Sequence, residues 1–304
     1  MIRLGLIGAG RWGRNYIRTI AALDGVRLTR LASRNPASAG WVGPGYVISA
    51  DWRQVIGAGG IEGVIIATPP SLHAQMTIAA VAAGIPVLVE KPLTLGLAEA
   101  ARLREQVRTR NGLVMVDHTH LYHPAFEELK RHVAALGMIR EIEAEAGNQG
   151  PYREDVPVLW DWGPHDIAMC LNLLRELPRE VSAARVAHER MGKAEAETVR
   201  LNLTFGAGLH ARITLSNMIA KTRRFAVHCD GGVLVYDDVA PNKLVLRRDE
   251  EEEPINVPPE PPLSRVVKAF VAGIDAGNDA TTSLDLAVDV VVVLGRCARV
   301  LATA

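Results

Sequence analysis

The sequence predicts an α/β protein with two sheets: a parallel one near the N-terminus, and an open, mostly antiparallel one in the α+β part that follows. The chain has 304 residues, which suggests roughly two domains at about 150 residues each. Up to residue 117, short aliphatic runs alternate with longer amphipathic stretches, a pattern typical of βαβ units. From Met138 onward the hydrophobic period changes to two, which indicates strands with one buried face.

The parallel sheet is predicted from six short aliphatic runs. Strands that are covered by helices on both faces are apolar throughout, and these runs have that composition. Amphipathic stretches that favour helices fall between most of them. The six predicted strands are residues 3–7, 27–32, 47–49, 63–67, 87–90 and 113–116, of which 47–49 is the weakest.

The second sheet is predicted from strict alternation of apolar and polar residues. Residues 199–205 and 209–215 both alternate, and Gly206-Ala207-Gly208 between them favours a hairpin. A second turn signal, Asp230-Gly231-Gly232, precedes the apolar run 233–236. These features predict an antiparallel sheet with one apolar face, in an α+β domain separate from the first.

The last part of the chain is predicted to contain a loop and two helices. The acidic run 249–253 and the five prolines that follow it lack any periodicity, which predicts a solvated loop. Residues 263–274 and 283–301 have the pattern of helices, and Ser283 is expected to open the second with Asp285 in its first turn. The predicted domains are residues 1–118, residues 119–282, and a C-terminal helix, residues 283–304, that packs back on the first domain.

The composition argues against several classes of protein. The 34 basic and 34 acidic side chains cancel, so the basic excess typical of proteins that bind nucleic acids or anionic membranes is absent. Three cysteines without a CxxC pair predict neither a disulfide framework nor a zinc site. The first residues lack the pattern of a secretion signal, and the apolar stretch 284–294 is shorter than the roughly 20 residues of a membrane span. We therefore expect a cytoplasmic protein.

A glycine-rich turn directly follows the first predicted strand and opens a predicted helix. Its sequence, Gly8-Ala9-Gly10-Arg11-Trp12-Gly13, matches GxGxxG. In this context Gly8 allows the tight turn, Gly10 lets a pyrophosphate approach the backbone, and Gly13 lets the helix pack closely on the strand. The first N–H groups of the helix, at Arg11, Trp12 and Gly13, would bind the phosphates. The N-terminal domain is therefore predicted to be a Rossmann dinucleotide-binding domain, with a purely structural glycine turn as the alternative.

The residues after the second predicted strand indicate which dinucleotide binds. An NAD site usually has a carboxylate here for the ribose hydroxyls, but this chain has Ser33 and Arg34. A hydroxyl and a guanidinium suit the 2′-phosphate of NADP(H). The sequence predicts an NAD(P) cofactor and favours NADP(H), unless Arg34 points into solvent, as surface arginines often do.

Two further motifs carry a family resemblance. The first is Ala67-Thr68-Pro69 with His73 downstream, and the second is Glu90-Lys91-Pro92. In this order after the glycine turn, the chain resembles the Gfo/Idh/MocA oxidoreductases over nearly its whole length. The resemblance implies a cis peptide bond before Pro92 and a nicotinamide cofactor bound in part by Thr68, Pro69, His73, Glu90 and Lys91.

Lys91 is the first candidate catalytic residue. By composition alone it is a solvated lysine after a strand. Its predicted position, at the carboxyl end of a parallel strand, is where open α/β sheets bind their ligands. The resemblance implies that this lysine contacts the reacting hydroxyl, where an ammonium group would stabilise alkoxide character.

Asp161 and His165 are the other two candidate catalytic residues. Gly163-Pro164 predicts a helix start, with His165 in the first turn and Asp161 just before it. A carboxylate close to an imidazole suits proton transfer near neutral pH, whereas a capping Asp161 beside an ordinary His165 is the alternative. The family's Asp-x-x-x-His motif matches both residues, and the resemblance therefore implies catalytic roles for them.

Three histidines within residues 118–123 raise the question of a metal site. No metal is expected, because the spacing matches no known ligand motif and the family that the chain resembles needs none. The resemblance places this segment beside nicotinamide and substrate, which makes His118, His120 and Tyr122 candidate substrate-binding residues, although many relatives have arginine in place of His120. Arg153 is a fourth candidate, or a surface arginine. Two runs, residues 147–153 and residues 160–166, look like relatives that oxidise the sugar ring of nucleotide-linked amino sugars.

The resemblance implies an NAD(P)-dependent oxidoreductase that transfers a hydride between nicotinamide and a hydroxyl or carbonyl carbon of a sugar, nucleotide sugar or polyol. Two alternatives within the same fold are a non-catalytic regulator that senses dinucleotide and an NAD-dependent glycosidase. A homodimer or homotetramer is also implied, since the open sheet of such relatives commonly packs on a partner subunit. The alternative is that this polar face is exposed to solvent and contacts no partner. The face is expected to carry Arg200, Asn202, Thr204, His210, Arg212 and Thr214.

Overall fold

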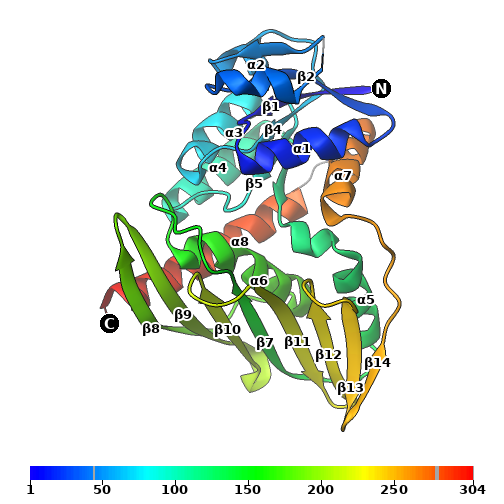
Figure 1. Ribbon diagram of the computed structural model, residues 1–304, viewed down its shortest axis with the longest axis vertical. Helices are drawn as coiled ribbons and strands as arrows, with labels where there is room; N and C mark the ends of the chain where they lie inside the picture. Colours follow the sequence, from blue (N-terminus) through cyan, green and yellow to red (C-terminus); the bar gives the residue numbers. More distant parts are fainter. Residues whose placement is uncertain (44, 278–280, 304) are drawn as a thin grey trace. The chain divides into compact units, whose positions relative to one another are not determined.

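The chain folds into two compact units in the computed structural model, which describes residues 1–43, 45–277 and 281–303. Unit 1 comprises Met1–Thr119 and Pro261–Val291, and unit 2 comprises His120–Glu260 and the residues from Val292 onward. Each unit is built around one sheet (Figure 1).

Unit 1 contains a six-stranded parallel sheet in the order β3-β2-β1-β4-β5-β6. The chain reverses direction across the sheet between β1 and β4, so the carboxyl ends of these strands form the switch point at which doubly wound sheets bind ligands. All six predicted strands are confirmed, each within one residue of its predicted bounds. They are β1 (Ile2–Ile7), β2 (Val26–Ala32), β3 (Val47–Ser49), β4 (Gly63–Ile66), β5 (Val87–Glu90) and β6 (Val114–Asp117).

Helices cover both faces of this sheet. Gly5 in β1 faces Val55 of α2, whereas the adjacent Leu4 lies beside Gly63, which faces Phe270 of α7 on the opposite side. Figure 1 shows α7, in orange, beside α1, in blue, although they are far apart in the sequence. The helices of unit 1 are α1 (Arg11–Ala21), α2 (Arg53–Gly57), α3 (His73–Ala82), α4 (Leu97–Thr109), α7 (Pro262–Ala276) and the first part of α8 (Thr281–Thr303).

Unit 2 contains an eight-stranded sheet in the order β14-β13-β12-β11-β7-β10-β9-β8. Among the described strand pairs of this sheet only β7–β10 is parallel, so the prediction of an open, mostly antiparallel sheet is confirmed, as are the hairpin β9–β10 and the turn before β12. The strands are β7 (Ile139–Gly147), β8 (Glu180–Met191), β9 (Ala194–Thr204), β10 (His210–Ser216), β11 (Thr222–Cys229), β12 (Gly232–Asp237), β13 (Leu244–Arg248) and β14 (Glu251–Pro254).

One face of this sheet is covered by α5 (Pro124–Val133) and α6 (Val158–Leu174) (Figure 1). Phe126 of α5 meets Phe225 of β11 edge to face, with ring centroids 6.1 Å apart, and both rings are buried. Such pairs stabilise a core beyond the area that they bury. On the opposite face Arg200, His210 and Arg212 are exposed, as the alternation predicts.

The acidic run predicts a loop, and this is wrong for Glu251–Pro254, which form the edge strand β14. Asp249 has a φ of 53°, a turn conformation that brings the chain back beside β13. Arg247 and Glu252 then face each other across the two strands and form an ion pair at 2.5 Å. Edge strands tolerate charged residues because one side is open to water, so a run without hydrophobic periodicity can still pair.

Two helices begin earlier than the sequence predicts. α6 begins at Val158 rather than at Gly163-Pro164, so Asp161 lies in its first turn and Pro164 lies inside the helix. The start is stabilised by the buried carboxylate of Glu197, which accepts a hydrogen bond from the N–H of Val158 at 3.1 Å and also suits the helix dipole. α8 already includes Thr281, so Ser283 does not open it.

The two units divide the chain differently from the predicted domains. α7, predicted for the second domain, belongs to unit 1. α8 belongs to unit 1 as far as Val291, where Arg108 donates two hydrogen bonds of 2.8 Å to Asp285. The rest of α8 belongs to unit 2, where Arg296 donates a hydrogen bond to the carbonyl of Pro178. Contacts between distant segments, which local sequence patterns do not encode, produce this division.

Candidate active site

The glycine turn of unit 1 lies at the switch point of its sheet. Gly8 follows β1 with a φ of 97°, and a Cβ here would lie 2.4 Å from the carbonyl oxygen of Ala67, which follows β4. A Cβ on Gly13 would lie 2.0 Å from the carbonyl oxygen of Gly8. Both positions therefore require glycine, the first for the turn and the second for close packing of α1.

The residues of this turn fit a dinucleotide. Gly10 is exposed, and among the described residues no atom would lie within 4 Å of a Cβ placed on it. Gly10 is also the N-cap of α1, where no side chain caps the helix. The first backbone donors of α1, at Arg11, Trp12 and Gly13, together with the positive end of the helix dipole, suit a pyrophosphate.

Two variants of this turn separate binding from folding. Gly10→Ala has room and an ordinary φ of −70°, so we expect the free energy of unfolding to change by at most about 1 kcal/mol, while the affinity for dinucleotide falls at least about tenfold. Gly13→Ala, by contrast, should destabilise the protein by about 3 kcal/mol because its methyl group meets backbone. Urea unfolding and fluorescence titration with NADPH measure both quantities. Unchanged affinity in a folded Gly10→Ala protein would contradict the site.

Ser33 and Arg34 follow β2, the neighbour of β1 in the sheet. The N–H of Ser33 donates to the carbonyl of Ser49 at 2.9 Å, and its hydroxyl accepts a hydrogen bond from the N–H of Asn35 at 3.2 Å. The Arg34 side chain is exposed. An exposed guanidinium beside a fixed hydroxyl at this edge is suited to a phosphate.

Thr68, Pro69 and His73 lie between β4 and α3, and His73 is buried. Its Nδ1 lies 2.8 Å from the carbonyl oxygen of Pro92, and its Nε2 lies 2.9 Å from the carbonyl oxygen of Thr68. Burial lowers the pKa of this imidazole, so the neutral ring donates one of the two bonds. His73 thus ties the Thr68 loop to the Lys91–Pro92 peptide, which is cis, as the resemblance implies. Because both ring nitrogens face carbonyls of the protein, His73 supports the loops around the site.

Lys91 lies at the carboxyl edge of the sheet of unit 1, among buried titratable groups. Burial raises the pKa of the Glu90 and Asp117 carboxyls, and the charge of Lys91 opposes this effect. Burial, together with the charge of Lys91, lowers the pKa of His118 to about 3. His118 is therefore neutral at physiological pH, and Lys91 supplies the positive charge at this edge.

Unit 2 brings two predicted site residues together, His165 of α6 and His120 of the segment before α5. Their ring centroids lie 4.9 Å apart with an angle of 82° between the planes. His120 Nδ1 lies 2.8 Å from the hydroxyl of Tyr236 in β12. Burial raises the pKa of Tyr236 well above its usual value, so the hydroxyl keeps its proton. If the neutral His120 accepts a hydrogen bond from this hydroxyl at Nδ1, it carries its proton on Nε2.

Asp161 and His165 lie four residues apart in α6, so their side chains extend from the same face of the helix. Arg153, in the loop before α6, donates a hydrogen bond to Asp161 at 3.1 Å. The same guanidinium also donates to both carboxylate oxygens of Asp155, at 2.9 and 2.7 Å. Arg153, predicted as a substrate-binding residue, thus holds two carboxylates of its own chain and balances the charge of Asp161.

Asp166 and Arg223 form a polar pair that the sequence analysis did not identify. Burial raises the pKa of Asp166 to about 6, against the opposing charge of Arg223. Arg223 also stacks on Trp162, 4.6 Å from the ring centroid. Among the described residues, one oxygen of Asp166 and one terminal nitrogen of Arg223 are buried without a hydrogen-bond partner. The pair therefore has capacity for a further polar group.

Tyr16, Asp117 and Tyr236 were also missed as site residues. The sequence offered a signal for Asp117, because this residue ends a buried strand at the same sheet edge as Lys91. It offered none for Tyr16 and Tyr236, since each occupies an apolar position in its element and looks like a core residue. Their hydroxyls find partners far away in the chain: Tyr16 donates to Asp117, which lies 101 residues further on.

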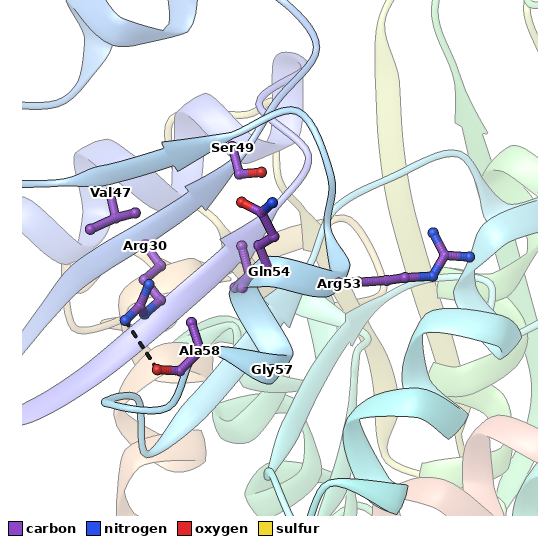
Figure 2. Close-up of a pocket in the computed structure, with 8 residues that line it drawn as sticks. Arg30, Val47, Ser49, Arg53, Gln54, Gly57 and Ala58 are labelled. Carbon is purple, nitrogen blue, oxygen red and sulfur yellow. Dashed lines mark hydrogen bonds between the residues drawn. The ribbon is translucent and has the colours of Figure 1, made fainter.

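A separate hollow lies in unit 1 between β2, β3 and α2 (Figure 2), with a volume of about 390 Å³. Arg30 reaches from β2 to the carbonyl of Ala58 at 3.4 Å, whereas Arg53 points away from the other labelled side chains. Its lining contains none of the predicted site residues.

Residues 1–43, 45–277 and 281–303 contain no group of three or more His, Cys, Asp or Glu side chains that could hold a metal ion. Within the same ranges, no helix combines the length and the apolar character needed to cross a bilayer.

The parallel sheet, its switch point and the glycine turn define a dinucleotide-binding protein of the Rossmann type. Residues 2–118 match the oxidoreductase family with an NAD-binding Rossmann fold, and residues 126–235 match the GFO/IDH/MocA C-terminal domain. The chain belongs to the Gfo/Idh/MocA family of NAD(P)-dependent oxidoreductases, which confirms the resemblance seen in its sequence.

Three relatives illustrate the similarity. A crystal structure from Magnetospirillum magnetotacticum MS-1, provisionally described as an oxidoreductase, is 46% identical with a TM-score of 0.92, over 97% of this chain and 99% of that one. UDP-N-acetylglucosamine 3-dehydrogenase from Acidithiobacillus ferrooxidans is 29% identical over 73% of this chain and 69% of its own length. The 4-carboxy-2-hydroxymuconate-6-semialdehyde dehydrogenase of Sphingobium sp. is 23% identical over 97% of each chain.

Proposed function

We propose that this chain transfers a hydride between NADP(H) and a hydroxyl or carbonyl carbon of a sugar, nucleotide sugar or polyol. The observation that carries the proposal is the position of Lys91. Its ammonium lies at the carboxyl edge of the sheet that also bears the glycine turn, and its charge acts on its neighbours there. A cation at this edge suits a reaction in which negative charge develops on the substrate oxygen.

The proposed mechanism gives each candidate residue one task. In the oxidising direction His165 accepts the hydroxyl proton, and Lys91 stabilises the negative charge on the oxygen. Asp161, one helical turn before His165, positions His165 or the substrate. A bound nicotinamide supplies the hydride acceptor. In the reducing direction the same groups act in reverse, with His165 donating the proton.

Nucleotide-linked amino sugars are the substrate class that we favour. The relative named UDP-N-acetylglucosamine 3-dehydrogenase, similar over most of its length, supports this choice, together with the run from Trp160 to Asp166. Incubation with a panel of such sugars, followed by absorbance of reduced nicotinamide and mass spectrometry of the products, tests it. A ketone product supports a dehydrogenase, whereas a cleaved glycosidic bond without net redox change supports the glycosidase alternative.

The preference for NADP(H) is proposed from Ser33 and Arg34. An exposed arginine here binds the 2′-phosphate but gives NAD(H) nothing comparable, so Arg34→Ala should weaken NADPH binding about tenfold or more and leave NADH binding nearly unchanged. Arg18→Ala, at another exposed arginine of unit 1, is the control. Equal losses for both dinucleotides, or no loss, would contradict this assignment. Fluorescence titration of the stripped wild type and of both variants with NADPH and NADH measures the six dissociation constants.

We also propose a homodimer or homotetramer that forms through the open face of the sheet of unit 2. That face carries charges of both signs, for example Arg212, which forms an ion pair with Glu143 at 3.3 Å. Such a face suits a polar contact with a second copy. Light scattering at micromolar concentration should show an oligomer, and a monomer would contradict the proposal. A cytoplasmic location remains part of the proposal, based on composition.

A further inference from the structure

Two carboxyl groups lie side by side beneath the edge that bears Lys91. Glu90 and Asp117 are register partners at the ends of the neighbouring strands β5 and β6. Glu90 is 5% exposed and Asp117 is fully buried. Two adjacent buried carboxyls cannot both ionise without a large cost, since each loses its hydration and repels the other.

The hydrogen bonds of the two groups differ. Asp117 Oδ2 accepts a bond from the hydroxyl of Tyr16 at 2.5 Å, and its Oδ1 accepts one from the hydroxyl of Thr119 at 2.7 Å. Donors on both oxygens stabilise the ionised form of Asp117. Glu90 interacts with the hydroxyl of Tyr16, but its Oε1 is buried without a partner among the described residues. A buried oxygen without a donor is much costlier on a carboxylate than on a neutral acid.

We infer that Glu90 stays protonated at neutral pH, and that Glu90, Tyr16 and Asp117 form a hydrogen-bonded chain with one negative charge that acts as a positioning unit for Lys91. The Tyr16 hydroxyl donates a hydrogen bond to Asp117 and accepts one from the protonated carboxyl of Glu90. The role toward Lys91 rests on the proposed function, in which Lys91 contacts the substrate. The protonation of Glu90 does not depend on it.

The charge count explains why the proton matters. Glu90 and Asp117 act on each other, and the other groups that act on them are Tyr16 of α1, Thr119 after β6, and Lys91. His118, beside Lys91, is neutral because burial lowers its pKa to about 3. One carboxylate therefore balances one ammonium. A second carboxylate would leave a net negative charge at the edge where the reaction builds negative charge on oxygen, which would oppose that reaction.

Tyr16 also connects this hydrogen-bonded chain of three residues to the helix that is proposed to bind the dinucleotide. It lies in α1, the helix that begins at the glycine turn, and its ring is fully buried. Its hydroxyl therefore links the dinucleotide helix to Asp117 at the end of β6 and to Glu90, the residue before Lys91.

Infrared spectroscopy of the full chain tests the protonation directly and needs no substrate. At pH 8 we expect the carbonyl stretch of a protonated carboxylic acid, which shifts when glutamate is labelled with carbon-13 but not when aspartate is. Glu90→Gln should remove the band, and the control Asp166→Asn should retain it. Absence of the band in the wild type, or a shift with labelled aspartate, would overturn the inference. If Glu90→Gln fails to fold, the labelled wild type still shows whether the protonated acid is a glutamate, and absence of that band overturns the inference.

Tyr16→Phe tests the link while keeping the buried ring. We expect the Glu90 band to change frequency and kcat to fall by about tenfold, with the affinity for NADPH unchanged. The control is Tyr46→Phe, at another tyrosine of unit 1, which should leave the band and kcat unchanged. An unshifted band would exclude Tyr16 from the chain. If the band is present but turnover does not depend on Lys91, the proposed function fails and the protonation of Glu90 stands; if turnover depends on Lys91 without the band, only this inference fails.

Discussion

Replacing Lys91 with methionine should lower kcat/KM by about a hundredfold to a thousandfold, while the affinity for NADPH stays within about threefold. Methionine keeps most of the length of the side chain and removes the ammonium. The alkoxide that forms as the hydride leaves then lacks its counter-charge, so the loss belongs to the transition state rather than to binding. Steady-state kinetics in both directions, with a parallel dinucleotide titration, measure the two effects separately.

The control for this variant is Lys193→Met, which removes an exposed lysine in the turn between β8 and β9. It should leave kcat/KM unchanged. A Lys91→Met protein that keeps its activity within about tenfold would refute the role of Lys91, because loss of a single stabilising group at the reacting oxygen costs more than that.

His165→Gln should lower kcat by about 10²–10⁴-fold, the usual range for the loss of a general base or acid. Oxidation needs neutral His165, so the wild-type rate should rise with pH as the imidazole loses its proton. Reduction needs the protonated form and should show the opposite trend. Both trends should vanish in the variant, because the glutamine side chain can form hydrogen bonds but has no titratable group. The pH profiles of kcat/KM in the two directions measure this.

His188→Gln is the matched control, since His188 is exposed in β8 and pairs there with Glu195 at 2.5 Å. Its pH profile should match that of the wild type. If His165→Gln instead keeps both pH trends at a reduced rate, another group transfers the proton and His165 only shapes the site.

The parallel sheet was predictable because its signals are local. Each strand is a short aliphatic run, and the turn at Gly8 and Gly13 has a steric need for glycine that the motif encodes directly. β14 was not predictable, since Glu251–Pro254 have no hydrophobic period; they pair with β13 along the backbone, with ion pairs such as Arg247–Glu252 across the two strands. The start of α6 was misplaced for a similar reason, because its cap is the carboxylate of Glu197, distant in sequence.

In the candidate site, too, contacts between residues that are distant in the sequence were not predictable. Motifs and the family resemblance pointed to Lys91, Asp161 and His165 as candidate catalytic residues. The polar groups found near these candidates include Asp117 and Tyr16 in unit 1 and Tyr236 in unit 2. Each reads as an ordinary strand or core residue until the fold brings it to its partner. Candidate reacting groups are thus easier to predict from a sequence pattern than the groups that adjust their charge and orientation.

The most direct test of the central claim is transfer of deuterium from reduced dinucleotide that is labelled at C4 of the nicotinamide. The protein is incubated with labelled NADPH or NADH, each deuterated on either face, and with the carbonyl forms of nucleotide sugars, sugars and polyols. Mass spectrometry should find one deuterated alcohol with the wild type, formed about a hundredfold to a thousandfold more slowly with Lys91→Met. Tight binding of dinucleotide without transfer to any of these compounds would contradict the account and favour a protein that senses the cofactor.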